Sequence, residues 1–305
     1  MDLRHLRYFV AVAEELHFGR AAERLHIAQP PLSQQIKALE TELGVRLFHR
    51  TKRRVDLTEA GRLFLDEACA VLARAERAVT TAQRAGRGEL GRLAVGYTGS
   101  TAYNPLVPRI IRHFRESFPT VELTLQDMHT MEQAPALLEG RIDVGFCRPP
   151  VPDPDGLLSI LPLLEEPLVA ALPAAHPQAP AATVTLAGLA HDPFILYPRA
   201  IGPGLFDRIV AACREAGFSP RVTQQAPQFA SIVGLVAAGL GVALVPTCLE
   251  QLRAQGVVYR PLADVHPTSP MAVAFRRGDR SPTAKAFVAV VREALKADTS
   301  NPALT

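Results

Sequence analysis

The chain has 305 residues, and the hydrophobic share of 48% is high enough for buried cores while leaving room for a polar surface. This length suits two or three domains, each able to bury its own apolar core. No apolar run is long enough to span a bilayer, and the N-terminal residues lack the apolar segment of a signal peptide. Together these features predict a soluble cytoplasmic protein of more than one domain.

Positive charge is concentrated at the start of the chain. The formal net charge is only +3, but residues 1–58 contain ten Lys and Arg against seven Asp and Glu, whereas the remaining residues contain 23 of each. The whole excess therefore lies in the first fifth of the chain. Such a distribution indicates a polyanionic partner for this segment.

The N-terminal segment shows the apolar spacing of three short helices. Residues 3–15 and 19–25 each place apolar side chains on one face, and the small Ala21 and Ala22 allow a close contact between helices. A third helix is predicted over residues 29–43, because it opens with prolines, which fit a first turn, and closes at Gly44, a favoured C-terminal cap. Its buried stripe is predicted to consist of Leu32, Ile36, Leu39 and Leu43.

The polar front end of the third helix suits base recognition. Gln29, Ser33, Gln34 and Lys37 lie on or near the face opposite the apolar stripe. In a helix-turn-helix the second helix enters the major groove, where Gln pairs bidentately with adenine and Ser meets phosphate or base edges. Taken alone, the same pattern also fits a surface helix whose polar residues are merely solvated.

A basic hairpin is predicted directly after this helix. Residues 45–50 and 55–57 have the pattern of two short strands, and the loop between them carries Lys52, Arg53 and Arg54. Isolated basic loops are usually just solvated. After a helix-turn-helix, however, a cationic hairpin tip is typical of a wing that lies along the phosphate backbone or enters a minor groove.

The first 61 residues closely resemble the LysR-type family of bacterial transcription regulators. The resemblance is dense and ordered, and its motifs lie at residues 3–9, 21–25, 29–36, 42–50 and 57–61. It implies a winged helix-turn-helix domain over residues 1–58. It also implies that Gln29, Pro30, Ser33 and Gln34 touch DNA from the recognition helix, and Arg53 from the wing.

A long linker helix is predicted over residues 59–86. Its proline-free part, residues 59–85, repeats apolar side chains every three or four positions, at Ala60, Phe64, Ala68, Val71, Ala75, Ala78 and Ala82. A helix this long has little core of its own, so its apolar face should meet the same helix of a second subunit. Packing against its own effector domain is the alternative. Residues 87–91 form a glycine-rich hinge, and the resemblance implies dimers that assemble into tetramers on DNA.

The rest of the chain predicts an α/β domain over residues 92–296. Strands at 93–97, 121–125 and 141–146 alternate with helices at 105–118 and 134–139, which argues for a parallel sheet. The later predicted elements are helices at 204–216, 229–238 and 282–295 and strands at 242–245, 257–259 and 271–275. Residues 297–305 are predicted to be a frayed tail.

Polar residues gather where the predicted parallel strands end. In open parallel sheets, ligands lie beyond the carboxyl ends of the strands, where helix N-termini offer free N–H groups. The first strand delivers Thr98, Gly99 and Ser100 to this edge, the second delivers Thr130, and the third delivers Arg148. Hydroxyls and an arginine suit a carboxylate, and Arg148 could bind it bidentately. Each residue alone also fits a helix cap or a surface position, but their convergence favours a site.

This domain is similar to LysR-type effector domains, especially those of regulators of aromatic-compound breakdown that respond to benzoate-like or muconate-like acids. The resemblance rests on residues 97–100, 128–130 and 145–148, with Ser100, Thr130 and Arg148 at matching positions and Pro203 and Leu205 at the opposite wall of the cleft. Gly99 and Leu205 depart from residues common in those regulators, so the identity of the effector stays open. The resemblance implies a periplasmic-binding-protein-like domain of two α/β subdomains, residues 92–163 with 267–296 and residues 164–266.

An enzyme and a redox sensor are the two alternatives to a regulator. An enzyme would need a catalytic motif, and the sequence has no P-loop, GxSxG, HExxH or strand-linked GxGxxG, so we predict no catalytic residue. A redox sensor would need paired cysteines, of which Cys213 and Cys248 are the only conceivable pair. The four cysteines show no CxxC or metal-ligand spacing, so we expect structural thiols and neither metal nor cofactor.

The sequence thus predicts an effector-controlled DNA-binding dimer or tetramer. Lys52, Arg53 and Arg54 would anchor phosphates, and Gln29, Ser33 and Gln34 would read bases. An acid bound near Ser100, Thr130 and Arg148 would change the geometry of the subdomains and of the dimer.

Overall fold

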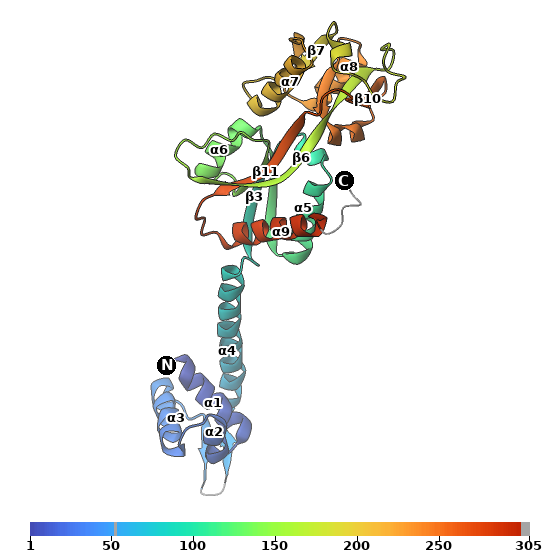
Figure 1. The fold of residues 1–305 in the computed structure, drawn as a ribbon. Helices are drawn as coiled ribbons and strands as arrows, with labels where there is room; N and C mark the ends of the chain where they lie inside the picture. Colours follow the sequence, from blue (N-terminus) through green and yellow to red (C-terminus); the bar gives the residue numbers. More distant parts are fainter. Residues whose placement is uncertain (52–53, 300–305) are drawn as a thin grey trace. The chain divides into compact units, whose positions relative to one another are not determined.

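The computed structural model describes residues 1–51 and 54–299 (Figure 1). Its contacts divide the chain into two compact units, Met1–Arg84 and the residues from Ala85 on. Lys52 and Arg53, which the sequence assigns to the wing, lie outside the described residues. Within the described part of the chain, no helix is both long and apolar enough to cross a membrane.

The first unit is three helices, a small hairpin and a long helix. Its elements are α1 (Leu3–Glu15), α2 (Phe18–Arg24), α3 (Gln29–Leu43), β1 (Phe48–Arg50), β2 (Val55–Leu57) and α4 (Glu59–Gly86), the last reaching just past the unit's end. The helices match the predicted ranges to within one residue. The first strand starts at Phe48 rather than at residue 45, because the amides of Leu47 and Phe48 donate to the Glu40 carboxylate at the end of the turn after α3.

The core of this unit is built around aromatic rings. Phe9 of α1 contacts Phe48 at 5.3 Å and Phe64 of α4 at 4.9 Å between ring centroids. Leu32 and Ile36, both fully buried, supply the α3 side of the core. The apolar stripe of α3 therefore faces inward as its spacing predicts, and this orientation turns its polar face outward.

Helix α4 uses its apolar stripe in two ways. Near its start, Phe64 and Ala68 pack into the core of the first unit itself. Further along, Val71 and Val79 are 45% and 57% exposed within the single chain. The expectation that the whole stripe would meet a second subunit is therefore wrong for its first half, which already has a core to lie on.

The second unit is an α/β structure with a mixed seven-stranded sheet. Its elements are β3 (Gly91–Tyr97), α5 (Leu106–Ser117), β4 (Val121–Asp127), α6 (Thr130–Leu138), β5 (Val144–Cys147), β6 (Leu158–Pro173), β7 (Pro193–Leu196), α7 (Pro203–Glu215), β8 (Arg221–Gln225), α8 (Phe229–Ala237), β9 (Ala243–Pro246), β10 (Val257–Pro261), β11 (Thr268–Arg276) and α9 (Pro282–Thr299), with short 3-10 turns at Thr101–Tyr103, Ala187–Leu189 and Thr247–Leu252. The strand order is β10-β6-β11-β5-β3-β4, with β9 also paired to β6. Strand β3 runs parallel to β4 and β5, which confirms the predicted parallel arrangement.

Helices cover both faces of this sheet. Helices α5 and α9 lie on one face and α6 on the other (Figure 1). Strand β11 shows the alternation directly, because Met271 and Val273 join the core under α5 and α9 whereas Ala272 and Ala274 join the core under α6.

A separate core lies around α7, α8 and the two-stranded parallel sheet of β7 and β8. The long strand β6 connects the two regions, because it pairs with β11 over its first part and with β9 and β10 over its second. The sequence analysis did not identify β6, β7 or β8. Prolines and glutamates interrupt the apolar pattern of β6, and all five residues of β8 are exposed.

Candidate DNA-binding face and effector site

The start of α3 presents its polar residues to solvent. Gln29, Pro30 and Gln34 are exposed and Ser33 is half-buried, whereas Leu32 is fully buried beneath them. Prolines at the second and third positions remove two N–H groups that a helix start leaves unpaired, so this end needs little capping. The structure thus places these side chains together on one accessible face.

A carboxylate that the sequence analysis did not single out holds this face in place. One oxygen of Glu40 accepts hydrogen bonds from the amides of Leu47 and Phe48 at 2.9 and 3.1 Å, and the other accepts from Arg50 at 2.8 Å. The Arg50 guanidinium also lies 4.8 Å from the centre of the Phe18 ring. Helix α3, the hairpin and α2 are therefore tied through one half-buried carboxylate.

The hairpin turn is closed at its base by Thr51 and Arg54. The Thr51 amide donates to the Arg54 carbonyl at 2.9 Å, and the Arg54 amide donates to Thr51 Oγ1 at 3.1 Å. The exposed Arg54 side chain forms an ion pair with Asp56 at 2.8 Å. Part of the Arg54 charge is therefore already neutralised, unlike the charge expected of an unpaired phosphate contact.

In the second unit, the polar residues predicted from strand ends converge on one small cavity, which we call the inner cavity. Thr98 and Ser100 follow β3, Thr130 begins α6 and Arg148 follows β5. The opposite wall consists of Tyr197, Ile201, Gly202, Leu205 and Phe229. The cavity has a volume of about 20 Å³. Five of the seven predicted effector residues, Thr98, Ser100, Thr130, Arg148 and Leu205, line it.

The other two predicted residues lie elsewhere. Gly99 lines a neighbouring cavity of about 200 Å³, which we call the outer cavity, together with Tyr103, Asp127, His129 and Gln228. Pro203 opens helix α7 but lines neither cavity. Tyr197 and Phe229, which the sequence analysis missed, line both. The sequence signal that could have located Tyr197 is the Tyr-Pro pair directly after the buried strand β7. Tyr197 is a polar residue at a strand end, as are the other residues of this site.

Arg148 is held by internal partners on every nitrogen. Its Nε donates to Ser100 Oγ at 2.8 Å, Nη1 to the Ser269 carbonyl and hydroxyl at 3.2 and 3.0 Å, and Nη2 to Glu166 at 2.5 Å. The side chain is only 7% exposed. In this conformation Ser269 and Glu166 occupy the donors that the predicted bidentate pair with a ligand carboxylate would use.

Glu166 is the buried counter-charge of Arg148. Burial alone would raise its pKa, but the charge and hydrogen bond of Arg148, with hydrogen bonds from Cys248, hold the pKa below its ordinary value of 4.5. The Cys248 amide donates to Glu166 at 2.9 Å. The pair is therefore ionised, and it connects β5, β6 and the turn after β9.

The two hydroxyls beside Arg148 are left as donors. Ser100 Oγ accepts from the Arg148 side chain, and Thr130 Oγ1 accepts from the Arg148 amide at 3.1 Å. A hydroxyl that accepts a hydrogen bond still has its own proton to donate. Both residues are nearly fully buried and line the inner cavity. The site can therefore supply hydrogen bonds to an anionic oxygen without using the guanidinium directly.

Comparison with known proteins decides the family. Residues 3–62 match the bacterial regulatory helix-turn-helix protein, lysR family, and residues 86–296 match the LysR substrate binding domain. The chain belongs to the LysR family. It is 40% identical to the HTH-type transcriptional regulator AlsR of Bacillus subtilis, over 94% of each chain. It is also 42% identical to the HTH-type transcriptional regulator CatR of Pseudomonas putida, over 96% of this chain and 99% of CatR.

Solved structures agree with this LysR assignment. The structure of CbnR, a LysR family transcriptional regulator, has a TM-score of 0.83 and 33% identity, covering 96% of this chain and all of CbnR. Full-length CbnR complexed with its target DNA has a TM-score of 0.80 and 32% identity, covering 97% of this chain and all of that one. The protein is thus a LysR-type DNA-binding transcription regulator with an effector-binding domain, and its family is one of regulators rather than enzymes.

Three of the four cysteines of this LysR-type regulator have the properties of structural thiols, whereas Cys69 of α4 is exposed, unlike the buried thiol expected from the sequence. All four, each within the described residues, are free. Burial raises the pKa of Cys147 and of Cys213 to about 12, and burial with the nearby Glu166 charge raises the pKa of Cys248 above its ordinary value. Thiols that stay protonated are poor nucleophiles toward oxidants. This disfavours the redox-sensor alternative.

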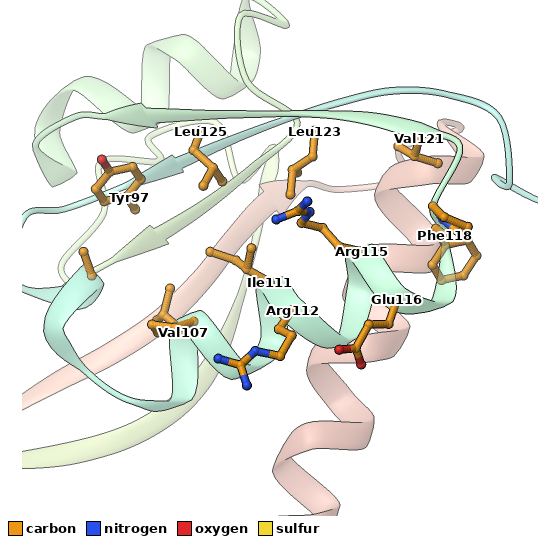
Figure 2. Close-up of a pocket in the computed structure, with 13 residues that line it drawn as sticks. Tyr97, Val107, Ile111, Arg112, Arg115, Glu116, Phe118, Val121, Leu123 and Leu125 are labelled. Atoms are coloured by element: carbon orange, nitrogen blue, oxygen red, sulfur yellow. The ribbon is translucent and has the colours of Figure 1, made fainter.

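A further hollow of this regulator lies between α5 and the edge strand β4, and we call it the α5–β4 groove. Figure 2 shows Leu123 and Leu125 of β4 facing Ile111 and Arg115 of α5 across it. The groove has a volume of about 1090 Å³, and Leu125 is 44% exposed. An open apolar groove beside an unpaired strand edge is a surface that another protein segment can cover.

Proposed function

We propose that this LysR-type regulator responds to a small, aromatic-derived organic acid bound at Ser100 and Thr130. The observation that carries the proposal is that both hydroxyls accept hydrogen bonds from Arg148 while lining one cavity. The Thr130 proton is then available, and the Ser100 proton can turn from Thr98 Oγ1, 3.5 Å away, to a carboxylate, an acceptor that needs such donors. Arg148 contributes through its charge and by orienting the two hydroxyls.

The opposite wall supports a ligand with an apolar body. Tyr197, Phe229, Leu205 and Ile201 supply rings and aliphatic carbons on that side. Ligand sites usually combine such apolar walls with a few well-placed polar groups. An acid derived from an aromatic compound matches this division between a polar and an apolar wall.

Effector binding requires the cleft to change. A cavity of about 20 Å³ has room for about one water molecule, far less than an aromatic acid needs. The ligand-bound form must therefore be wider. Because the two walls come from residues 92–163 and 164–266, which we assign to two subdomains, binding would alter their relative orientation and so favour one conformation of the regulator.

In the DNA-binding unit, we assign base reading to Gln29, Ser33 and Gln34, with Pro30 contacting DNA at the helix start. Their common exposed face on α3 supports this role. Lys52, Arg53 and Arg54 would contact phosphates, Arg54 more weakly because of its pair with Asp56.

We further assign the exposed part of the α4 stripe to a dimer with a second copy of α4. Val71 and Val79 are large exposed apolar residues there, next to small alanines that allow close approach. The α5–β4 groove is a second apolar surface that a further copy can cover, which supports assembly of dimers into tetramers.

The effector assignment is tested with Ser100→Ala in the full-length protein. Calorimetric titration with benzoate and with cis,cis-muconate should show binding to the wild type that weakens roughly 10- to 100-fold in the variant, the effect of losing a hydrogen bond to a charged group. Affinity for operator DNA should not change. The exposed Ser117→Ala is the control. If Ser100→Ala binds the same acids as tightly as the wild type, the hydroxyl site is wrong.

A further inference from the structure

The two walls of the inner cavity are held very differently. The hydroxyl wall is fixed, since Ser100, Thr130 and Arg148 are each nearly buried and bonded to one another at the ends of sheet strands. On the other wall the Tyr197 ring stacks on Phe229, with 5.0 Å between centroids and 14° between planes. The ring also lies close to Gly202, where a Cβ would come within 2.6 Å of two ring carbons. The Tyr197 ring is therefore packed against Phe229 and Gly202.

The Tyr197 ring separates two cavities. Together with Phe229 it lines both the inner cavity, with its two hydroxyl donors, and the outer cavity of about 200 Å³. The inner cavity has the Ser100 and Thr130 hydroxyls but too little volume for an acid with an apolar body, whereas the outer cavity has more volume but not these hydroxyls. Displacing this one ring would join them.

A single hydrogen bond holds the ring across the cleft. The Tyr197 hydroxyl lies 2.7 Å from Nδ1 of His129, the residue before Thr130 at the start of α6. Burial, with the charges of Asp127 and Glu132, raises the pKa of Tyr197 to about 12, so the phenol stays protonated and forms this hydrogen bond with the imidazole as a neutral group. The bond therefore ties the Tyr197 wall to the hydroxyl wall.

We propose that Tyr197 is a gate, latched by His129, and that its release joins the inner and outer cavities into one ligand site. This rests on the proposed effector site. The acid group then lies at Ser100 and Thr130, and the body of the ligand extends past the displaced ring into the outer cavity. Gly99 leaves space there, because no described atom lies within 4 Å of a Cβ built at that position.

If Tyr197 is a gate, removal of its hydroxyl should tighten ligand binding. If Tyr197 is merely structural, the same removal should leave binding unchanged or weaken it. If the ligand binds only the open form, loss of the latch raises the population of that form and tightens binding. Tyr197→Phe removes the hydroxyl and keeps the ring. In full-length protein titrated with benzoate, the dissociation constant should fall about three- to tenfold, the range that one hydrogen bond supplies. An unchanged or higher dissociation constant overturns the gate.

Tyr259→Phe is the matched control. The Tyr259 hydroxyl is buried and, among the described residues, has no hydrogen-bond partner, so its removal breaks no latch. This variant should bind benzoate as the wild type does. His129→Ala should reproduce the effect of Tyr197→Phe, and the double variant should add nothing further, because both remove the same bond. Additive effects overturn the pairing.

A separate variant tests whether the ligand extends into the outer cavity. Gly99→Leu places a side chain where the ligand body should lie, without contacting a described atom in the ligand-free protein at its Cβ. Benzoate affinity should fall at least tenfold while the ligand-free melting temperature stays within about 2 °C of the wild type. Unchanged affinity places the ligand elsewhere and overturns this part of the proposal.

Hydrogen exchange without ligand separates failure of the gate from failure of the effector assignment. In Tyr197→Phe, amides of residues 129–134 and 197–206 should exchange several-fold faster than in the wild type, and in Tyr259→Phe they should not. If no acid binds any variant but exchange rises in this way, the effector class is wrong and the gate stands. If exchange is the same in Tyr197→Phe and the wild type, the gate is wrong whatever binds.

Discussion

The two units of this regulator keep their polar functional residues in opposite states. In the DNA-binding unit, Gln29 and Gln34 are exposed above a packed core. In the effector unit, Ser100, Thr130 and Arg148 are buried and bonded to one another. The residues assigned to DNA reading are accessible as they stand, whereas those assigned to the effector become accessible only in a more open form of the cleft.

This difference also decides in which unit a substitution should lower the free energy of unfolding. Side chains on an exposed face can be replaced at little cost to folding, so their loss affects binding alone. Side chains of a buried ionic network cannot, because each supports the others. The predictions below compare the units on that basis.

The largest effect is expected from Arg148→Met. This change leaves the Glu166 charge buried without its partner, which costs roughly 3–5 kcal/mol of the free energy of unfolding. The control is Arg199→Met, whose pair with Asp207 is exposed to solvent and should contribute far less to the free energy of unfolding. Urea unfolding of the full-length variants measures both. A loss of similar size in the two variants would show that the Arg148 pair behaves as a surface pair.

Removal of Glu166, the partner of Arg148, and the pH dependence of stability test the same ion pair further. Arg148→Met combined with Glu166→Gln should cost less than Arg148→Met alone, because no unpaired charge remains. Since the pKa of Glu166 is lowered in the folded state, its contribution is complete above its ordinary value of 4.5 and is lost as the pH falls through the lower folded-state pKa. Glu166→Gln should flatten this part of the stability profile.

A smaller effect is expected from Glu40→Ala in the DNA-binding unit. The change removes the acceptor of two amides and the partner of Arg50, at a cost of about 1–3 kcal/mol. Hydrogen exchange over residues 45–58 should rise, and operator affinity should fall because the hairpin is no longer held to α3. Glu42→Ala, at an exposed position of the same helix, should change neither. Equal effects of the two variants would contradict the role of the half-buried Glu40 carboxylate.

The fold was predictable where pattern and burial agree. The helices of the DNA-binding unit follow their apolar spacing, and β3, β4 and β5 are continuous apolar runs or simple alternations. Strand β6 was missed because its prolines and its glutamate at 166 serve the connection between two cores and the Arg148 pair, which no local pattern encodes. The first half of α4 was assigned to a partner because the sequence does not show that Phe64 reaches Phe9.

The site was predictable only in part, for a related reason. The rule that ligands bind at strand ends located Ser100, Thr130 and Arg148 on the strands that were recognised. Tyr197 follows β7, which was not recognised, and its partner His129 is 68 residues away in the chain. The hydrogen bonds from Arg148 to Glu166 and Ser269 likewise join segments that are distant in the chain. The spacing of residues in the sequence therefore could not show that these donors already have internal partners.

The smallest and most selective effects are expected at the DNA face, where Gln29→Ala and Arg53→Ala should differ in kind. Loss of a base contact should cost about 1–3 kcal/mol on the operator and little on unrelated DNA, relaxing sequence preference. Loss of a phosphate contact should weaken binding to all sequences and reduce the slope of log affinity against log salt concentration by about one. Arg54→Ala should reduce the slope less, because Asp56 already pairs with Arg54.

Titrations of operator and scrambled duplexes at several salt concentrations measure these effects. If Gln29→Ala and Arg53→Ala weaken both duplexes equally, the division between base reading and phosphate anchoring is wrong.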